Sequence, residues 1–369
     1  MRTRILGVFA ALAVALSAGA QSTEALTAVA TRDQKIVKRW TLPGDPRGVA
    51  VGKDGTVYVG LAQPQAVVAI DPKTGAIKRR AVLDSAEIAS TKELVTLRTN
   101  PERTRLYIAN GSDESATILS LPDLGVIREI TMEGEAIRDV LPDPSGRFLY
   151  LLGRDVHVFD IDGGTNLRTI ELEHASGQPM AITTTANGAL LAVIATEDYG
   201  NAKATAVAIY DAANNFAEVT REPLQTDKAV EGAFFAANDR ALVAFGRDAL
   251  YEKPVVSRPA KTLQGGTNGQ MRVAFDFGDF VNSDRVCLPE GSGPQIAVTG
   301  ATSDQLFYVE RRCSSGATFS GSQRRVTPAS LYGVNAYALA YDASTNTLAA
   351  TDRAGFLTIY KVPRPAVVK

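Results

Sequence analysis

The feature that most constrains the fold is a series of short apolar runs separated by turn signals, clearest between Pro46 and Ile77. Three runs, GVAV, TVYVG and AVVAID, are divided by the turn signal at residues 53–55 and by a polar loop around Pro64. A fourth run, AIKRRAVL, follows the DPKTG turn at residues 71–75. Four short strands in about 40 residues are typical of one blade of a β-propeller, in which each blade is a four-stranded sheet.

The same spacing recurs along the chain and predicts an all-β, seven-bladed β-propeller. No apolar pattern with a period of 3.6 residues persists for three turns, which argues against helices. The pattern is least regular in the fifth and sixth blades, so six or eight blades remain alternatives. Residues 252–270, rich in Pro, Gly, Lys and Thr, are expected to form a loop. The anchors of the predicted second strands, 41 to 64 residues apart, are Tyr58, Tyr107, Tyr150, Ala192, Ala244, Tyr308 and Ala349.

The two ends of the repeated region predict how the ring closes. Residues 35–42 read as an isolated strand before the first full blade, and residues 356–362 as a third strand with no fourth behind it. We expect the N-terminal strand to complete the last blade. The predicted organisation is a signal peptide (1–20), a flexible leader (21–33), the propeller (34–363) and a C-terminal tail (364–369).

The first twenty residues have the composition of a secretory signal peptide. Arg2 and Arg4 precede an apolar run over residues 5–16, and Ala18-Gly19-Ala20 is an A-x-A cleavage site. Cleavage after Ala20 predicts a periplasmic or secreted protein, with an uncleaved anchor as the alternative. The apolar run is short for a bilayer and no second one follows, so no membrane span is expected after cleavage.

Charge and cysteine content narrow the partners and the compartment. The chain has 39 basic and 40 acidic side chains, and without residues 1–20 its net charge is near −3. A nearly neutral chain offers no global field for nucleic acid, so no nucleic-acid partner is expected. The two cysteines, Cys287 and Cys313, are expected to pair in an exported chain, with free thiols as the alternative.

The motif PxGVAV…DG…VYV…AVVAIDPKTG resembles the YVTN family of β-propeller repeats. Residues 56–60 and 106–110 are similar to its tyrosine-centred strand, and residues 70–75 to its turn between the third and fourth strands. The likeness covers about 35–362. It implies turns made by Gly and Asp and tyrosines that fill the space between blades. It implies no reaction, because the family includes binding and scaffold proteins while related seven-bladed propellers include sugar lactonases.

The central mouth of a propeller is its default binding pocket. Residues that open or enter the predicted inner strands, with one loop histidine, are the candidates for it. Their mixed charges suit a small polar ligand, and mutual ion pairs around a water-filled channel are the alternative. These candidates are Arg47, Arg98, Arg138, Asp139, His174, Glu231 and Tyr337.

Two motifs with metal-binding residue types have simpler structural interpretations. His157 lies in a Val-His-Val-Phe strand and is expected to be structural or solvent-facing. Asp160, Asp162 and Glu171 match positions 1, 3 and 12 of a calcium loop, but Gly164 and Thr165 do not suit positions 5 and 6. A simple turn is therefore favoured, and neither a metal nor a cofactor is expected.

A second candidate site is a basic segment late in the chain. Arg311 and Arg312 precede a Ser/Gly-rich stretch, and Arg324 and Arg325 follow it. Four cations around one loop suit an anionic polysaccharide or a phosphate-bearing surface. A solvated hairpin tip is the alternative.

Together these features predict an exported β-propeller that acts as a non-catalytic binding platform at the cell envelope, for a protein or a small polar ligand. One alternative is a lactonase-like or metal-assisted hydrolase with its site at the central mouth. The other is a binder of anionic polysaccharide.

Overall fold

The computed structural model describes residues 25–28, 36–83, 92–111, 114–172, 179–198, 203–224, 230–236, 241–246, 249–257, 263–265, 272–276, 294–297, 305–310, 315–320, 325–330, 336–342, 345, 347–352 and 354–361. These residues form strands and turns without a helix, which confirms the all-β prediction. Accordingly, the described part of the chain contains no helix long and apolar enough to cross a membrane.

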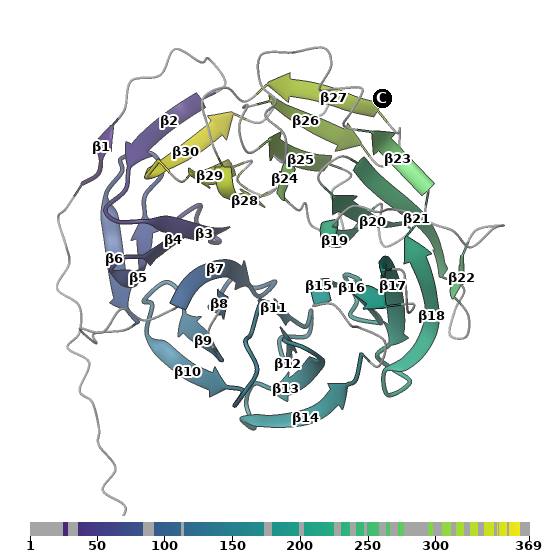
Figure 1. Ribbon diagram of the computed structural model, residues 1–369. Helices are drawn as coiled ribbons and strands as arrows, with labels where there is room; N and C mark the ends of the chain where they lie inside the picture. The colour runs from purple at the N-terminus through teal and green to yellow at the C-terminus, as the bar shows by residue number, and fades with distance from the viewer. Residues whose placement is uncertain are drawn as a thin grey trace, which may run out of the picture.

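The described strands form seven antiparallel sheets that follow one another around a common centre, each with its first strand innermost (Figure 1). The first sheet has β3 (Pro46–Val51), β4 (Val57–Ala62), β5 (Gln65–Ile70) and β6 (Ile77–Val82). The second has β7 (Lys92–Thr99), β8 (Arg105–Gly111), β9 (Ser115–Ser120) and β10 (Val126–Thr131). The third has β11 (Asp139–Pro142), β12 (Phe148–Leu152), β13 (Val156–Asp160) and β14 (Thr165–Ile170).

The later sheets repeat this order with additions. The fourth has β15 (Pro179–Thr184), β16 (Leu190–Asp198), β17 (Lys203–Asp211) and β18 (Ala217–Leu224). The fifth has β19 (Val230–Ala236), β20 (Ala241–Gly246) and β21 (Ala249–Ser257), with β22 (Leu263–Gly265) and β23 (Arg272–Asp276) both paired to β21. The sixth has β24 (Pro294–Ala297), β25 (Gln305–Glu310), β26 (Ser315–Ser320) and β27 (Arg325–Ser330).

The seventh sheet is built from both ends of the described chain. Its order is β28 (Ala336–Asp342), β29 (Thr347–Asp352), β30 (Phe356–Lys361), β2 (Ile36–Thr41) and β1 (Thr27–Ala28). Strand β2 pairs antiparallel with β30, with Lys38 opposite Ile359 and Trp40 opposite Leu357. The first long strand of the described chain thus lies beside the last.

Apolar cores lie between successive sheets, and this explains the sequence pattern. Strand β5 is buried at every position because neighbouring sheets cover both of its faces. The outer strand β6 begins with buried Ile77 and then alternates exposed and partly buried positions. Tyr58, Tyr107 and Tyr150 occupy the same register in three second strands, and each is at most 2% exposed. Each belongs to the core shared with the following sheet, as the family resemblance implied.

Three segments differ from the expectations. Residues 252–257 and 263–265, expected as loop, belong to strands. Pro254 is accommodated because it lies between the stretch of β21 that pairs with β23 (249–252) and the stretch that pairs with β22 (255–257). The expected Ser/Gly loop between the arginine pairs contains strand β26, which pairs with β25 and β27. Within the expected leader, β1 pairs with β2, and buried Leu26 donates its amide to the Gly75 carbonyl at 2.8 Å.

Candidate functional site

The two faces of the molecule carry different kinds of connection. We call the face at which the inner strands begin the loop face, and the opposite one the turn face. On the turn face, four connections between first and second strands span five residues each: 52–56, 100–104, 143–147 and 185–189. On the loop face, the described connections vary in length, for example from two residues at 63–64 and three at 153–155 to seven at 132–138. Variable loops on a regular frame are where binding residues concentrate.

The turn-face connections share one backbone design. In each, the amide of the fourth residue donates to the carbonyl of the first, at 2.8–3.0 Å. The fourth residue has a left-handed backbone in every case, and it is Gly55, Arg103, Gly146 or Gly188. The carboxylate of Asp160 serves a similar purpose in the turn after β13, accepting the amides of Asp162 and Gly163 at 3.0 and 2.8 Å. The Asp160 carboxylate and the glycines of these connections therefore stabilise turns.

Several inner strands, although not β11, begin with a bulge on the loop face. The pairing register shifts between Pro46 and Val49, between Val230 and Gly232, and between Ala336 and Ala338. A bulge leaves an extra residue out of the ladder and redirects its side chain. Three sequence-predicted candidates lie within these bulges: Arg47, Glu231 and Tyr337. The side chains of the last two, and all of His174, lie outside what the structure describes.

Two of the predicted arginines are held in ion pairs with aspartates. The Arg47 guanidinium lies 2.7 Å from a carboxylate oxygen of Asp45. Arg98 reaches from β7 to Asp139 on the next sheet, where Nε and Nη2 donate to the two carboxylate oxygens at 3.2 and 2.8 Å. Asp139 also accepts the amide of Val140. These four side chains therefore follow the alternative of mutual ion pairing.

Arg138 differs from them. It directly precedes β11, and its backbone amide donates to the Leu152 carbonyl at 2.8 Å. Its side chain is half-buried, and among the residues that the structure describes no carboxylate pairs with it. Burial lowers the pKa of the Arg138 guanidinium. The structure thus leaves one partly desolvated cation at the start of an inner strand, beside the neutralised Asp139.

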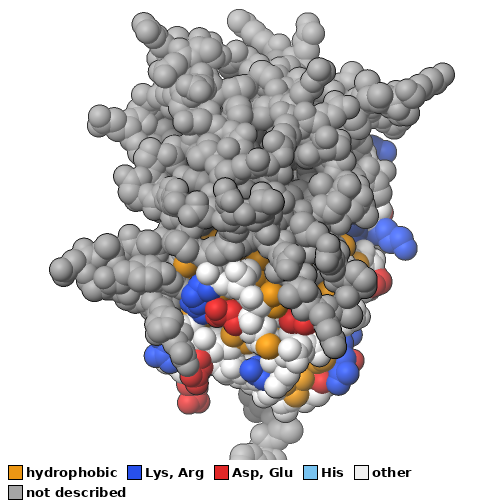
Figure 2. Space-filling model, turned by 90° about the vertical axis from the view of Figure 1, so that its right-hand side faces the viewer, with side chains coloured by type: hydrophobic (Ala, Val, Ile, Leu, Met, Phe, Trp, Pro, Cys, Tyr) orange, Lys and Arg blue, Asp and Glu red, His pale blue; other side chains and the backbone are white. Residues whose placement is uncertain are grey.

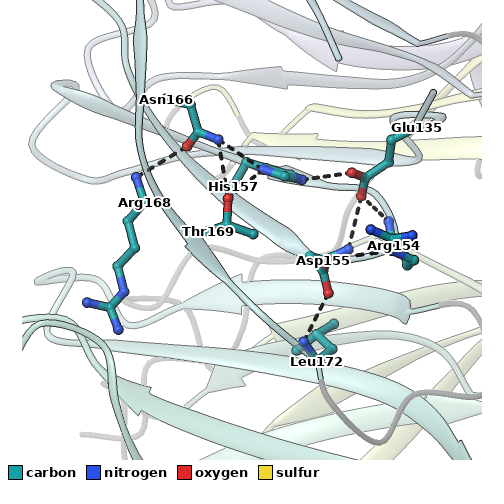
Figure 3. Close-up of polar contacts among 8 residues, drawn as sticks. All are labelled: Glu135, Arg154, Asp155, His157, Asn166, Arg168, Thr169 and Leu172. Carbon is teal, nitrogen blue, oxygen red and sulfur yellow. Dashed lines mark hydrogen bonds and ion pairs between the residues drawn. The ribbon is translucent and has the colours of Figure 1, made fainter. Parts of the chain in front are cut away.

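The loop that carries Arg138 is anchored by Glu135 (Figure 3). One Glu135 oxygen accepts the amides of Arg154 and, at 3.0 Å, of Asp155 in the turn between β12 and β13. The other lies 3.0 Å from Nε2 of His157. A Cβ on Gly153 would lie 2.1 Å from Glu135, so glycine is required for this close approach. We call Glu135 and His157 with these two amides the Glu135 latch.

The second ring nitrogen of His157, Nδ1, also has hydrogen-bonding partners. Nδ1 of His157 lies 3.1 Å from Nδ2 of Asn166 and 3.1 Å from the Thr169 hydroxyl (Figure 3). The side-chain oxygen of Asn166 accepts a hydrogen bond from the Arg168 backbone amide. The side-chain amino group of Asn166 therefore faces the imidazole, and Nδ1 of His157 acts as an acceptor. His157 is 7% exposed, which confirms the structural interpretation and excludes the solvent-facing one.

The latch was the part of this region that sequence reasoning missed. The alternation of β13 placed His157 on the face opposite the valines, but nothing in the loop sequence singled out Glu135 as its partner. On the side seen in Figure 2, described acidic and basic side chains are interspersed. Within the described residues, no group of three His, Cys, Asp or Glu side chains is placed to hold a metal ion.

Comparisons with known proteins bear on the fold. No protein-family model and no curated protein matches the sequence. Among solved structures, the β-propeller domain of Cps50 (Swd1) from Myceliophteria thermophila superposes with a TM-score of 0.67 at 15% identity, over 89% of this chain and 99% of that one. The fold is a β-propeller.

Two further solved structures are similar to this propeller in fold. A chain of hydrazine synthase from Kuenenia stuttgartiensis has a TM-score of 0.65 at 12% identity, over 90% of this chain and 99% of that one. A chain of the Mitotic Checkpoint Complex has a TM-score of 0.65 at 13% identity, over 99% of this chain and 100% of that one. Identities this low relate the propeller to its neighbours by fold alone.

Proposed function

We propose that the chain is a closed seven-bladed propeller with YVTN-type repeats. Support for closure comes from the pairing of β2 with β30 and from the core that Trp40 and Leu357 share with the first sheet. Support for the repeat type comes from the equivalent tyrosines in three second strands and from the DPKTG turn after β5.

We propose further that this propeller is exported and binds a protein partner at the cell envelope through its loop face. The signal-peptide pattern of residues 1–20 supports export. The observation that carries the binding role is the contrast between the faces, because four turns on one side repeat one backbone design whereas bulged, charged segments of varied length lie on the other. One neighbour in fold belongs to a multiprotein assembly, the Mitotic Checkpoint Complex.

Site-specific photo-crosslinking in the cells that make the protein tests the face assignment. The crosslinking residue replaces exposed Glu133 on the loop face or, as the matched control, exposed Lys53 on the turn face. A discrete protein adduct from position 133 and none from position 53 is expected. No adduct from position 133, or the same adducts from both, would contradict a partner on the loop face.

No described residues favour a lactonase-like or metal-assisted hydrolase, and a melting temperature that moves with calcium, magnesium or EDTA would revive it. The structure does not describe the side chains proposed for polysaccharide binding, which are Arg311, Arg312, Arg324 and Arg325. It does not describe Cys287 and Cys313 either. The six-residue strand β26 between the two arginine pairs spans about 20 Å, which weighs against one four-cation cluster.

A further inference from the structure

We propose that Arg138 forms an oxyanion subsite on the loop face and binds one carboxylate or phosphate group of the ligand. The proposal deepens the proposed function, since it names the chemistry that the loop face recognises. It starts from the charges at the beginnings of the inner strands. Arg47 is paired with Asp45 and Arg98 with Asp139, so each of these pairs is close to neutral. Arg138 adds one positive charge that no described carboxylate balances.

The position of Arg138 makes this charge difficult to explain as a structural element. A guanidinium that gives up part of its hydration without an ion pair is destabilising unless a partner compensates. Burial lowers the pKa of Arg138, in keeping with such desolvation. The neighbouring Asp139 does not pair with it, and its charge is balanced by the bidentate ion pair with Arg98. A ligand oxyanion would supply the missing charge.

The backbone around Arg138 is fixed on both sides, which prepares the subsite before binding. Upstream, the Met132 amide donates to the Glu114 carbonyl at 2.7 Å and the Glu135 latch holds the loop to the β12–β13 turn. Immediately before and after Arg138–Asp139, Ile137 and Val140 are 1% and 0% exposed in the core between the second and third sheets. A binding residue on a fixed backbone loses less conformational entropy when its ligand arrives.

The chemistry of the side chain defines the ligand class. A guanidinium presents a planar fork of donors that matches carboxylate and phosphate oxygens, and such charge-assisted pairs are the strong hydrogen bonds of proteins. The bidentate Arg98–Asp139 pair beside it shows that geometry within the same site. Arg138 offers one guanidinium without a described carboxylate partner, so a single oxyanion group is expected.

Thermal unfolding of the exported chain with inorganic phosphate or acetate, at constant ionic strength, tests the proposal. The variant is Arg138→Gln, and the matched control is Arg80→Gln, an exposed arginine of β6 without a described carboxylate partner. We expect phosphate or acetate to raise the melting temperature of the wild type and of Arg80→Gln. Arg138→Gln should lower the apparent affinity by about tenfold. The anion that acts more strongly identifies the group as phosphate or carboxylate.

Two controls make each outcome decisive. Melting temperatures without added anion show whether Arg138→Gln is folded, and Arg138→Lys, which keeps the charge but loses the fork, should bind with intermediate affinity. Equal shifts for the wild type and Arg138→Gln, or no shift of the wild type with either anion, overturn the subsite. Neither result depends on the photo-crosslinking outcome, so the subsite and the partner-binding role fail separately.

Discussion

Arg103 departs from the pattern of its own repeat. It occupies the left-handed position (φ 56°) that glycine fills in the other three five-residue turns, where a side chain costs about 1–2 kcal/mol. Its guanidinium lies 2.5 Å from the carboxylate of Asp342, which is 1% exposed, and 3.4 Å from the Gly52 carbonyl. The side chain therefore connects the second sheet to the first and the seventh.

Removing this connection is expected to destabilise the fold. Arg103→Gln keeps the strained backbone but removes the ion pair with Asp342, so the unfolding free energy should fall by about 1–3 kcal/mol. A double-mutant cycle with Asp342→Asn, measured by urea unfolding, should give a coupling energy above about 1 kcal/mol. A coupling near zero would mean that the pair contributes nothing to the ring.

Acidification is expected to remove the contribution of the Glu135 carboxylate to the stability of the fold. Burial by itself would raise the pKa of this carboxyl, but hydrogen bonds from the Asp155 amide, His157 and the Arg154 amide outweigh it and lower the pKa below the usual 4.5. The unfolded state therefore takes up its proton first as the pH falls. The stabilisation is complete above pH 4.5 and is lost as the pH falls through the lower folded pKa.

Urea unfolding of the wild type and Glu135→Gln between about pH 3 and pH 7 tests whether this stabilisation is lost on acidification. The difference in unfolding free energy should be largest near neutrality and should shrink toward the acid end. A difference that stays constant across the range would show that the carboxylate charge of Glu135 is unimportant to the latch.

At the scale of elements, the seam between the seventh and first sheets is packed by β2 and the turn after β5. The Trp40 indole donates to the Pro72 carbonyl at 3.2 Å and lies against Gly75, where a Cβ would come within 2.6 Å of the ring. Leu26 adds a backbone bond to the same turn while β1 pairs with β2. Side-chain contacts and a backbone hydrogen bond therefore both connect the seventh sheet to the first.

Gly75→Ala is expected to disturb this seam, and Gly134→Ala is its matched control. Both glycines have a left-handed backbone, with φ of 74° and 76°, but nothing lies within 4 Å of a Cβ on Gly134. Both substitutions should cost about 1–2 kcal/mol from the backbone, and Gly75→Ala about 1–3 kcal/mol more from overpacking. Equal losses in chemical denaturation would place Trp40 away from this turn.

The strands were easier to predict from sequence than the contacts between them. Runs such as AVVAID showed the period and length of buried strands, and the solitary run at 35–42 indicated that β2 needs a distant partner. The arginine candidates Arg47, Arg98 and Arg138 were found by their place in the repeat, but whether each is paired depends on the side chains of neighbouring sheets. The Glu135 latch, joining residues 22 apart through a loop without a motif, had no sequence signal.

At the scale of the whole molecule, stability is distributed over cores that each join two successive sheets. The core between the seventh and first sheets contains Trp40, Val59 and Leu357, so residues from both ends of the repeated region pack in one place. A loop face that presents Arg138 from the third sheet beside Arg98 from the second relies on this shared packing. Ring closure is therefore the central claim on which the proposed site depends.

Hydrogen exchange of the backbone amides, read by mass spectrometry, tests closure most directly. If β2 completes the seventh sheet, the amides of Ile36–Thr41 should be protected as strongly as those of Phe356–Lys361, because both then exchange through the same opening. Exchange of Ile36–Thr41 at the rate of an unstructured segment, while Phe356–Lys361 stays protected, would contradict the closed propeller.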